Sequence, residues 1–270
     1  MSSMLAPSAG LGRARAVGFG LLVHLARFAV IMVGSVIAPL LGITGWFTGL
    51  FVNVLCAAFA IVLVTRLKLW RRSGFLTLWR GRVALAFLGV LVIEALVRVL
   101  PLGLENTAPG FGLWAVTLLL VGFNEELVSR VVVLDRLSRS FTAIPAVAIT
   151  AALFGLQHLS AFATGNRDAV DILTNVLASA CYGFALAAFQ YRFAWVWPLI
   201  LIHATADFTT ILTGSVDAGD LLAIVTSVAF VIYGVVVLRG RSPLQAGPSL
   251  GGRDDRRAAR EPGRPRPVVR

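Results

Sequence analysis

Long apolar runs are the feature that most constrains the fold of this chain. They cover residues 17–41, 43–64, 83–102, 111–134, 143–159, 170–189, 194–212 and 220–238. A helix needs about 20 consecutive apolar residues to cross a bilayer. The chain is 58% hydrophobic and only 14% charged, whereas a soluble domain is about a quarter charged. The sequence therefore predicts an all-α fold, a polytopic transmembrane helix bundle of about eight spans.

The positive charges predict how this bundle is oriented. Basic residues gather in the N-terminal segment, in 66–82, in 135–141, in 190–193 and in the tail, whereas the alternate loops are neutral or acidic. Under the positive-inside rule, the basic segments and both termini face the cytoplasm. The net charge of +11 then reflects topology, and we expect no nucleic-acid partner. His24 and Arg27, in the first run, are expected to extend toward the interface.

The chain divides into three parts on this interpretation. Residues 1–16 are an N-terminal cytoplasmic segment, 17–238 a transmembrane domain and 239–270 a basic cytoplasmic tail, which its Arg, Pro and Gly content predicts to be disordered. Cys56 and Cys181 both lie in apolar runs. We expect them to be free thiols, and no cysteine-based metal site is predicted.

The run 111–134 carries charged residues in its middle, where burial in the bilayer is energetically unfavourable. A charged side chain at the bilayer centre costs at least ~2.5–3.5 kcal/mol, and such residues mark pumps, transporters, channels or intramembrane enzymes. Two later runs carry histidines and one more carboxylate. We call these residues the polar cluster: Glu125, Glu126, Arg130, His158, His203 and Asp207.

Helical spacing suggests which of these residues share a face. Glu126 and Arg130 are four apart, so the arginine can hold the carboxylate ionised. Glu125 points about 100° away from Glu126 and is free to face another helix. His203 and Asp207 are also four apart and lie on one face.

Two histidines and a carboxylate form a set with recognisable chemistry. Glu125, His158 and His203 can bind Zn²⁺ with an open fourth position, or position a water without a metal. In both cases a hydrolytic site is expected, with an acid–base glutamate and histidines that stabilise an oxyanion. A purely structural role for all six residues, and a proton relay through Glu125 and His203 in a transporter, remain the alternatives.

Three motifs in chain order resemble a known family. They are Glu125-Glu126-x-x-x-Arg130, Phe154-x-x-x-His158 and His203-x-x-x-Asp207, each in its own apolar run. Together they resemble the CPBP family of CAAX-processing and bacteriocin-processing (ABI) intramembrane endopeptidases, which includes the type II CAAX prenyl proteases. The resemblance covers about 125–207 by motif.

The resemblance implies catalytic roles for the whole polar cluster. Glu125 would activate the attacking water, aided by His158 and His203, which together with Glu125 would also hold a zinc ion if one is used. Glu126 and Arg130 would be the supporting pair. The prenyl proteases often have Asn at the position of Asp207, where it is proposed as an oxyanion donor; an ionised Asp cannot donate, so this residue would orient His203 or ligate a metal instead.

The expected protein is a multi-pass enzyme of a bacterial plasma membrane that cleaves a hydrophobic or membrane-anchored peptide. A bacterial source argues against a prenylated substrate. A catalytically silent immunity or regulatory protein that binds a partner peptide is the main alternative. One inconsistency accompanies this interpretation: at 1.5 Å per residue, Glu125 lies roughly 15 Å from the inner end of its run and His158 roughly 24 Å from the inner end of its own.

Overall fold

The computed structural model describes residues 9–97, 99, 103–164, 168–213 and 219–240. Most of the tail and the first eight residues lie outside these ranges, so the predicted disorder of the tail stays a prediction. The division into three parts is likewise untested. The helix predicted to start at residue 17 begins earlier, because α1 covers Ala9–Leu40 and includes much of the segment expected to precede it.

Every regular element of the described residues is helical, which confirms the all-α prediction. The elements are α1 (Ala9–Leu40), α2 (Trp46–Arg66), α3 (Trp70–Ser73), α4 (Arg82–Val97), α6 (Phe111–Glu126), η1 (Leu127–Val133), α7 (Leu134–Ser138), α8 (Ala143–Leu156), η2 (Gln157–Ser160), α9 (Ala161–Thr164), α10 (Ala169–Phe193), α11 (Val196–Leu212) and α12 (Gly219–Leu238).

Four helical segments of the described part are long and apolar enough to cross a membrane: Gly12–Leu40, Trp46–Arg66, Ala143–Ala163 and Ala169–Phe193. Val196–Leu212 and Ala223–Leu238 are shorter apolar helices. Large apolar side chains such as Val36, Ile93 and Leu177 are exposed on the outside of the bundle, as expected where lipid is the solvent. The multi-pass character is supported, while the count of eight spans and the cytoplasmic termini stay predictions.

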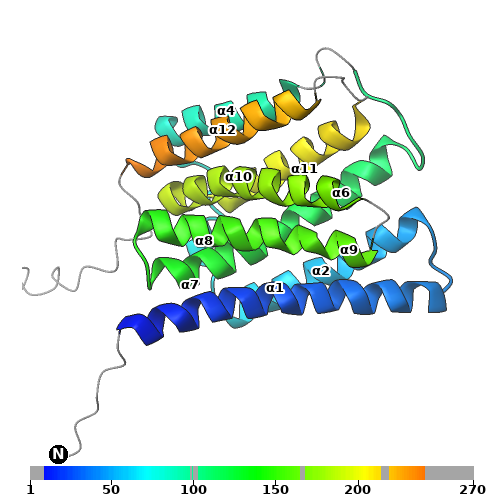
Figure 1. Cartoon of the computed structure of the whole chain (residues 1–270), viewed down its shortest axis with the longest axis horizontal. Coiled ribbons are helices and arrows are strands. Elements are labelled where there is room, and N and C mark those ends of the chain that lie inside the picture. Colours follow the sequence, from blue (N-terminus) through cyan, green and yellow to red (C-terminus); the bar gives the residue numbers. More distant parts are fainter. Residues whose placement is uncertain (1–8, 98, 100–102, 165–167, 214–218, 241–270) are drawn as a thin grey trace, which may run out of the picture.

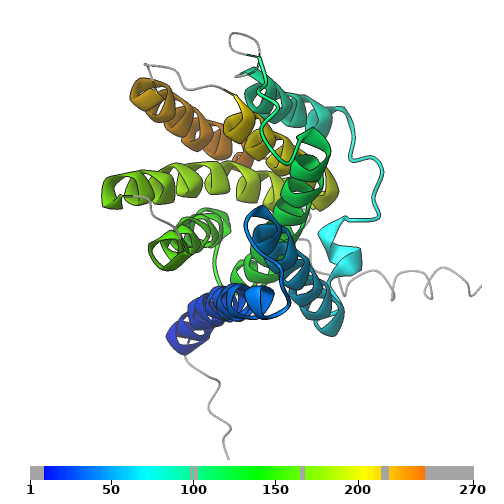
Figure 2. The ribbon, with the colours of Figure 1, turned by 90° about the vertical axis from the view of Figure 1, so that its right-hand side faces the viewer.

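The helices form two layers (Figure 1). In one layer α10 packs between α8 and α12, and α8 also contacts α1. In the other, α6 packs between α2 and α11, and α11 contacts α4. Figure 2, turned by 90°, shows the order α12, α10, α8 and α1 along the first layer. One contact between the layers is the hydrogen bond from Arg27 on α1 to Glu125 on α6.

The helix that carries the charged motif runs further than expected. It continues without a break from α6 through η1 and α7 to Ser138, beyond the expected end at residue 134. Glu125 is then roughly 20 Å from the end of its helix and His158 roughly 23 Å from Ala143, so the apparent mismatch in depth largely disappears. The η1 segment is π-helical, a rare form that is frequently found at functional sites.

A glycine allows α6 and α11 to approach closely. A Cβ at Gly122 would lie 2.7 Å from the carbonyl oxygen of Ile200 and 3.2 Å from the nitrogen of Ala204. No ordinary side chain fits in that space. This contact brings the end of α6 next to His203 on α11.

Candidate active site

The carboxylate of Glu125 faces two different helices. Its Oε1 accepts a hydrogen bond of 2.8 Å from Nη2 of Arg27 on α1. Its Oε2 lies 3.8 Å from Nε2 of His203 on α11. Because Glu125 is only 8% exposed, the arginine replaces much of the water that would otherwise solvate the charge. One oxygen is thus held by a cation, and the other is directed at an imidazole.

Arg27 corrects the expectation that it extends toward the membrane interface. It is 6% exposed, and its guanidinium points into the bundle, where Nε donates to Oδ1 of Asn124 at 2.8 Å. His24, one turn earlier on the same helix, is also buried. The physical reason is depth: α1 begins at Ala9, so Arg27 lies roughly 27 Å along the helix, too far for its side chain to reach that end.

Glu126 connects an arginine to a histidine. Its Oε2 lies 3.2 Å from Nε of Arg130, as the spacing of four residues predicts. Its Oε1 lies 2.9 Å from Nδ1 of His203. An ionised carboxylate can only accept, so Nδ1 of His203 is the donor. The contact with Glu126 therefore holds the ring by Nδ1 and leaves Nε2 facing Glu125.

Phe154 is the packing centre between the two histidines. Its ring centroid lies 5.4 Å from that of His158 and 5.8 Å from that of His203. The guanidinium of Arg130 covers the same ring, 4.2 Å from its centroid, which adds a cation–π contact to a buried charge. The motif position occupied by Phe154 thus brings three members of the polar cluster together.

His158 lies in η2, and its orientation is set by its own helix. Its Nδ1 is 3.1 Å from the carbonyl oxygen of Phe154. A carbonyl oxygen only accepts, so Nδ1 donates, and Nε2 is the acceptor atom of the neutral ring. His158 joins the polar cluster through the ring of Phe154 and stands within electrostatic reach of Glu125.

Asp207 lies next to the same imidazole ring as Glu126. Its Oδ2 lies 3.6 Å from Nε2 of His203, and one third of its side chain is exposed. Glu126 holds Nδ1, so the two carboxylates contact different nitrogens of His203.

The predicted zinc site requires three ligand atoms that can reach one metal ion. Zinc needs three protein ligands about 2.0–2.3 Å from one point. Nε2 of His158, Nε2 of His203 and Oε2 of Glu125 have lone pairs to offer. Within the described ranges, however, no three His, Cys, Asp or Glu side chains are grouped closely enough to hold a metal ion. Arg27 also places a positive charge at Glu125. This arrangement does not fit a resident zinc ion, and zinc stays a prediction for experiment.

The sequence analysis missed Arg27 and Asn124 as members of this site. Asn124 donates from Nδ2 to Oδ1 of Asn53 on α2 at 3.2 Å and accepts from Arg27, so it links three helices. Both residues interrupt apolar runs, the same signal that identified Glu125. Cys56 and Cys181 are free thiols, as expected.

Comparison with known proteins supports the family resemblance. Residues 107–209 match a family model described as "Type II CAAX prenyl endopeptidase Rce1-like". The matched stretch includes all six residues of the polar cluster together with Phe154. No curated protein and no solved structure matches the chain. Residues 107–209 are thus similar to the Rce1-like type II CAAX prenyl endopeptidases, the group that the three motifs resemble.

Proposed function

We propose that this protein is an intramembrane endopeptidase that hydrolyses a peptide bond of a hydrophobic or membrane-associated peptide. The observation that carries the proposal is the gap of 3.8 Å between Oε2 of Glu125 and Nε2 of His203. A water held there donates a hydrogen to Oε2 of Glu125. Its own lone pair then faces outward, toward a substrate carbonyl.

The chemical steps follow from this geometry. Glu125 takes a proton from the water as general base, and the resulting hydroxide attacks the carbonyl carbon. The protonated Glu125 then gives that proton to the leaving amine, so the peptide bond breaks and the carboxylate returns to its charged form. Arg27 and Asn124 keep Glu125 in one orientation through the cycle.

The two histidines have separate roles in this mechanism. His203 directs Nε2 at the position of this water, and Glu126 holds the ring in that orientation through Nδ1. His158 presents Nε2 from the opposite layer. In its neutral form this atom accepts a hydrogen bond, and only the protonated ring donates one to an oxyanion. Asp207 lies next to Nε2 of His203 and is one third exposed, so we expect a substrate to approach the ring from the side of Asp207.

The test compares Glu125→Gln and His158→Ala with the wild type in proteoliposomes, using fluorogenic hydrophobic peptides. Loss of the general base is expected to slow hydrolysis by about 10²–10⁴-fold. Glu105→Gln, which makes the same change at an exposed residue, is the matched control and should cleave at the wild-type rate. Cleavage by folded Glu125→Gln at the wild-type rate contradicts the proposal.

The Glu125→Gln variant also tests the peptide-binding alternative, in cells. A catalytically silent immunity or regulatory protein would protect cells equally well with Glu125→Gln. The contact of Arg27 with Oε1 of Glu125 is compatible with such a binding protein, because it leaves only one oxygen of the carboxylate for catalysis. A proton-coupled transporter would instead show peptide-independent proton flux that Glu125→Gln abolishes.

A further inference from the structure

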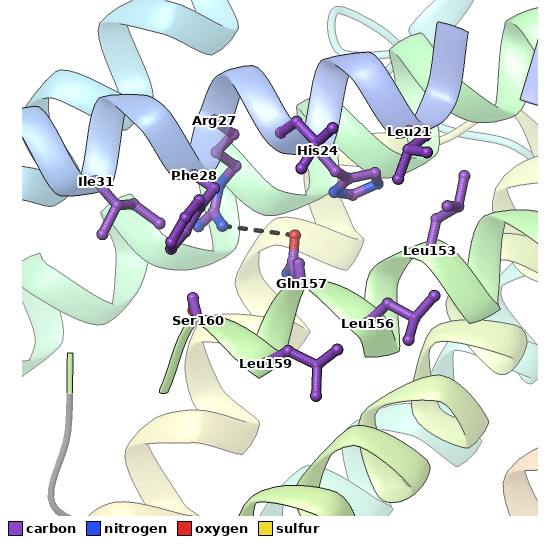
Figure 3. A pocket seen from close by; sticks show the side chains of 11 residues that line it. Leu21, His24, Arg27, Phe28, Ile31, Leu153, Leu156, Gln157, Leu159 and Ser160 are labelled. Atoms are coloured by element: carbon purple, nitrogen blue, oxygen red, sulfur yellow. Dashed lines mark hydrogen bonds between the residues drawn. The ribbon is translucent and has the colours of Figure 1, made fainter. Parts of the chain in front are cut away.

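A cavity lies between α1 and the segment formed by α8 and η2 (Figure 3). Its volume is about 380 Å³, near the lower end of the range of about 300–1,000 Å³ that ligand pockets cover. Most of its walls are apolar, with Leu21 and Phe28 on one side and Leu153 on the other. The volume suits a short piece of extended chain and is too small for a folded partner.

Polar groups on the wall of this cavity lack partners. His24 is 7% exposed, and its two ring nitrogens make no hydrogen bond of ordinary geometry. The same is true of the amide nitrogen of Gln157, on the opposite wall. A buried polar group without a partner costs about 1–3 kcal/mol. Figure 3 shows the two side chains facing the space between the helices.

The cavity adjoins the candidate active site. Arg27 lines it, and the same guanidinium holds Glu125 at 2.8 Å. Gln157 accepts from Nη1 of Arg27 at 3.5 Å. On the outer side the cavity is bordered by Leu25 and Leu156, which are both exposed on the apolar surface of the bundle. A molecule dissolved in the bilayer can therefore enter sideways and reach a position one side chain away from Glu125.

We propose that this cavity is a subsite for the peptide substrate, which binds an apolar side chain together with the backbone amide next to it. The inference rests on the proposed function and names where the peptide lies. A backbone amide in hydrocarbon needs hydrogen-bond partners, and the protein presents the ring nitrogens of His24 and the amide nitrogen of Gln157, which lie next to each other and make no hydrogen bond of ordinary geometry. A lipid acyl chain has no polar atoms and would leave both unsatisfied, so the peptide is the better occupant.

A cavity-filling variant tests this subsite. Leu156→Trp puts an indole at the outer border of the cavity, and Leu85→Trp on α4 is the matched control, because these two leucines are 48% and 46% exposed. Leu156→Trp is expected to lower kcat/KM for the fluorogenic hydrophobic peptides by about tenfold to a hundredfold, the range expected for a lost apolar contact in a pocket. Leu85→Trp should match the wild type. If Leu156→Trp does not fold, Leu25→Trp fills the cavity from the α1 side.

Photolabelling tests peptide binding in the cavity independently of the proposed catalysis. The Glu125→Gln protein in phosphatidylcholine vesicles is irradiated with a short leucine–alanine peptide that carries photo-leucine. We expect labelling on α1 or on the α8–η2 segment, and its loss in Glu125→Gln/Leu156→Trp but not in Glu125→Gln/Leu85→Trp. If no protein cleaves any peptide, the proposed catalysis fails, and the labelling alone still decides the subsite.

Two results overturn the inference. One is cleavage by Leu156→Trp at the wild-type rate together with labelling of Glu125→Gln/Leu156→Trp at the level of Glu125→Gln, which leaves the proposed function intact when Glu125→Gln is inactive. The other is labelling of the cavity by a photoactivatable phosphatidylcholine that an excess of the peptide does not displace. That second result assigns the cavity to lipid.

Discussion

Arg27 on the first helix and Glu125 at the end of α6, 98 positions apart in the chain, form a buried ion pair of 2.8 Å. Both residues are almost wholly removed from solvent. The pair fixes one oxygen of the carboxylate and leaves the other facing His203. It also anchors α1, which contributes a wall of the adjacent cavity, to the centre of the bundle.

Arg27→Leu is expected to destabilise the protein by about 3–5 kcal/mol, because it leaves a buried carboxylate without its partner. The measurement is the free energy of unfolding in detergent micelles. Arg71→Leu, at an exposed arginine, should stay within about 0.5 kcal/mol of the wild type. The double variant Arg27→Leu/Glu125→Gln should lose clearly less than the sum of the single losses. Strict additivity would show that the two side chains are not coupled.

Glu126→Gln tests the orienting role of a residue that does not touch the substrate. The variant keeps the shape of the side chain but removes the charge that holds Nδ1 of His203 as the donor. We expect kcat to fall by roughly a hundredfold, as when the orienting partner of a functional histidine is lost, with KM nearly unchanged. The readout is steady-state hydrolysis in proteoliposomes. A change confined to KM would instead indicate a role in binding.

Gly122→Ala tests the close approach of α6 and α11. The added Cβ would meet the carbonyl oxygen of Ile200 at 2.7 Å, so the helices must separate. Overpacking of this kind costs about 1–3 kcal/mol and should also lower activity by lengthening the contact between Glu126 and His203. Gly112→Ala is the control on the same helix, where nothing lies within 4 Å. That control should be neutral or slightly stabilising, since alanine favours the helix by up to about 1 kcal/mol.

Removal of metal separates the two hydrolytic mechanisms. The described residues bring no three ligand side chains together, and Arg27 already neutralises Glu125, so we expect hydrolysis to persist within about twofold after dialysis against EDTA. Metal analysis of wild type and His158→Ala accompanies the assay. Stoichiometric zinc in the wild type, its loss in His158→Ala and recovery of activity on adding zinc would establish the zinc enzyme instead.

The sequence by itself was sufficient for the helical class and for the pairing of Glu126 with Arg130. Hydropathy is a local property, so apolar runs located the helices, although their ends were displaced at Ala9 and Ser138. Spacing of four residues correctly paired Glu126 with Arg130, because the contact lies within one turn of a single helix. The order of the three motifs indicated the family that the match over 107–209 supports.

Contacts between helices were decided by the tertiary structure alone. Nothing local in the sequence links Arg27 to Glu125 or Glu126 to His203, because these pairs form only when α1 and α11 pack against α6. Gly122 permits that packing, yet its role is visible only once Ile200 is seen opposite. The sequence thus determined which charges lie within the bundle. The arrangement of helices determined which charge neutralises which, because in a low-dielectric interior each buried charge is stabilised by the partner that packing places beside it.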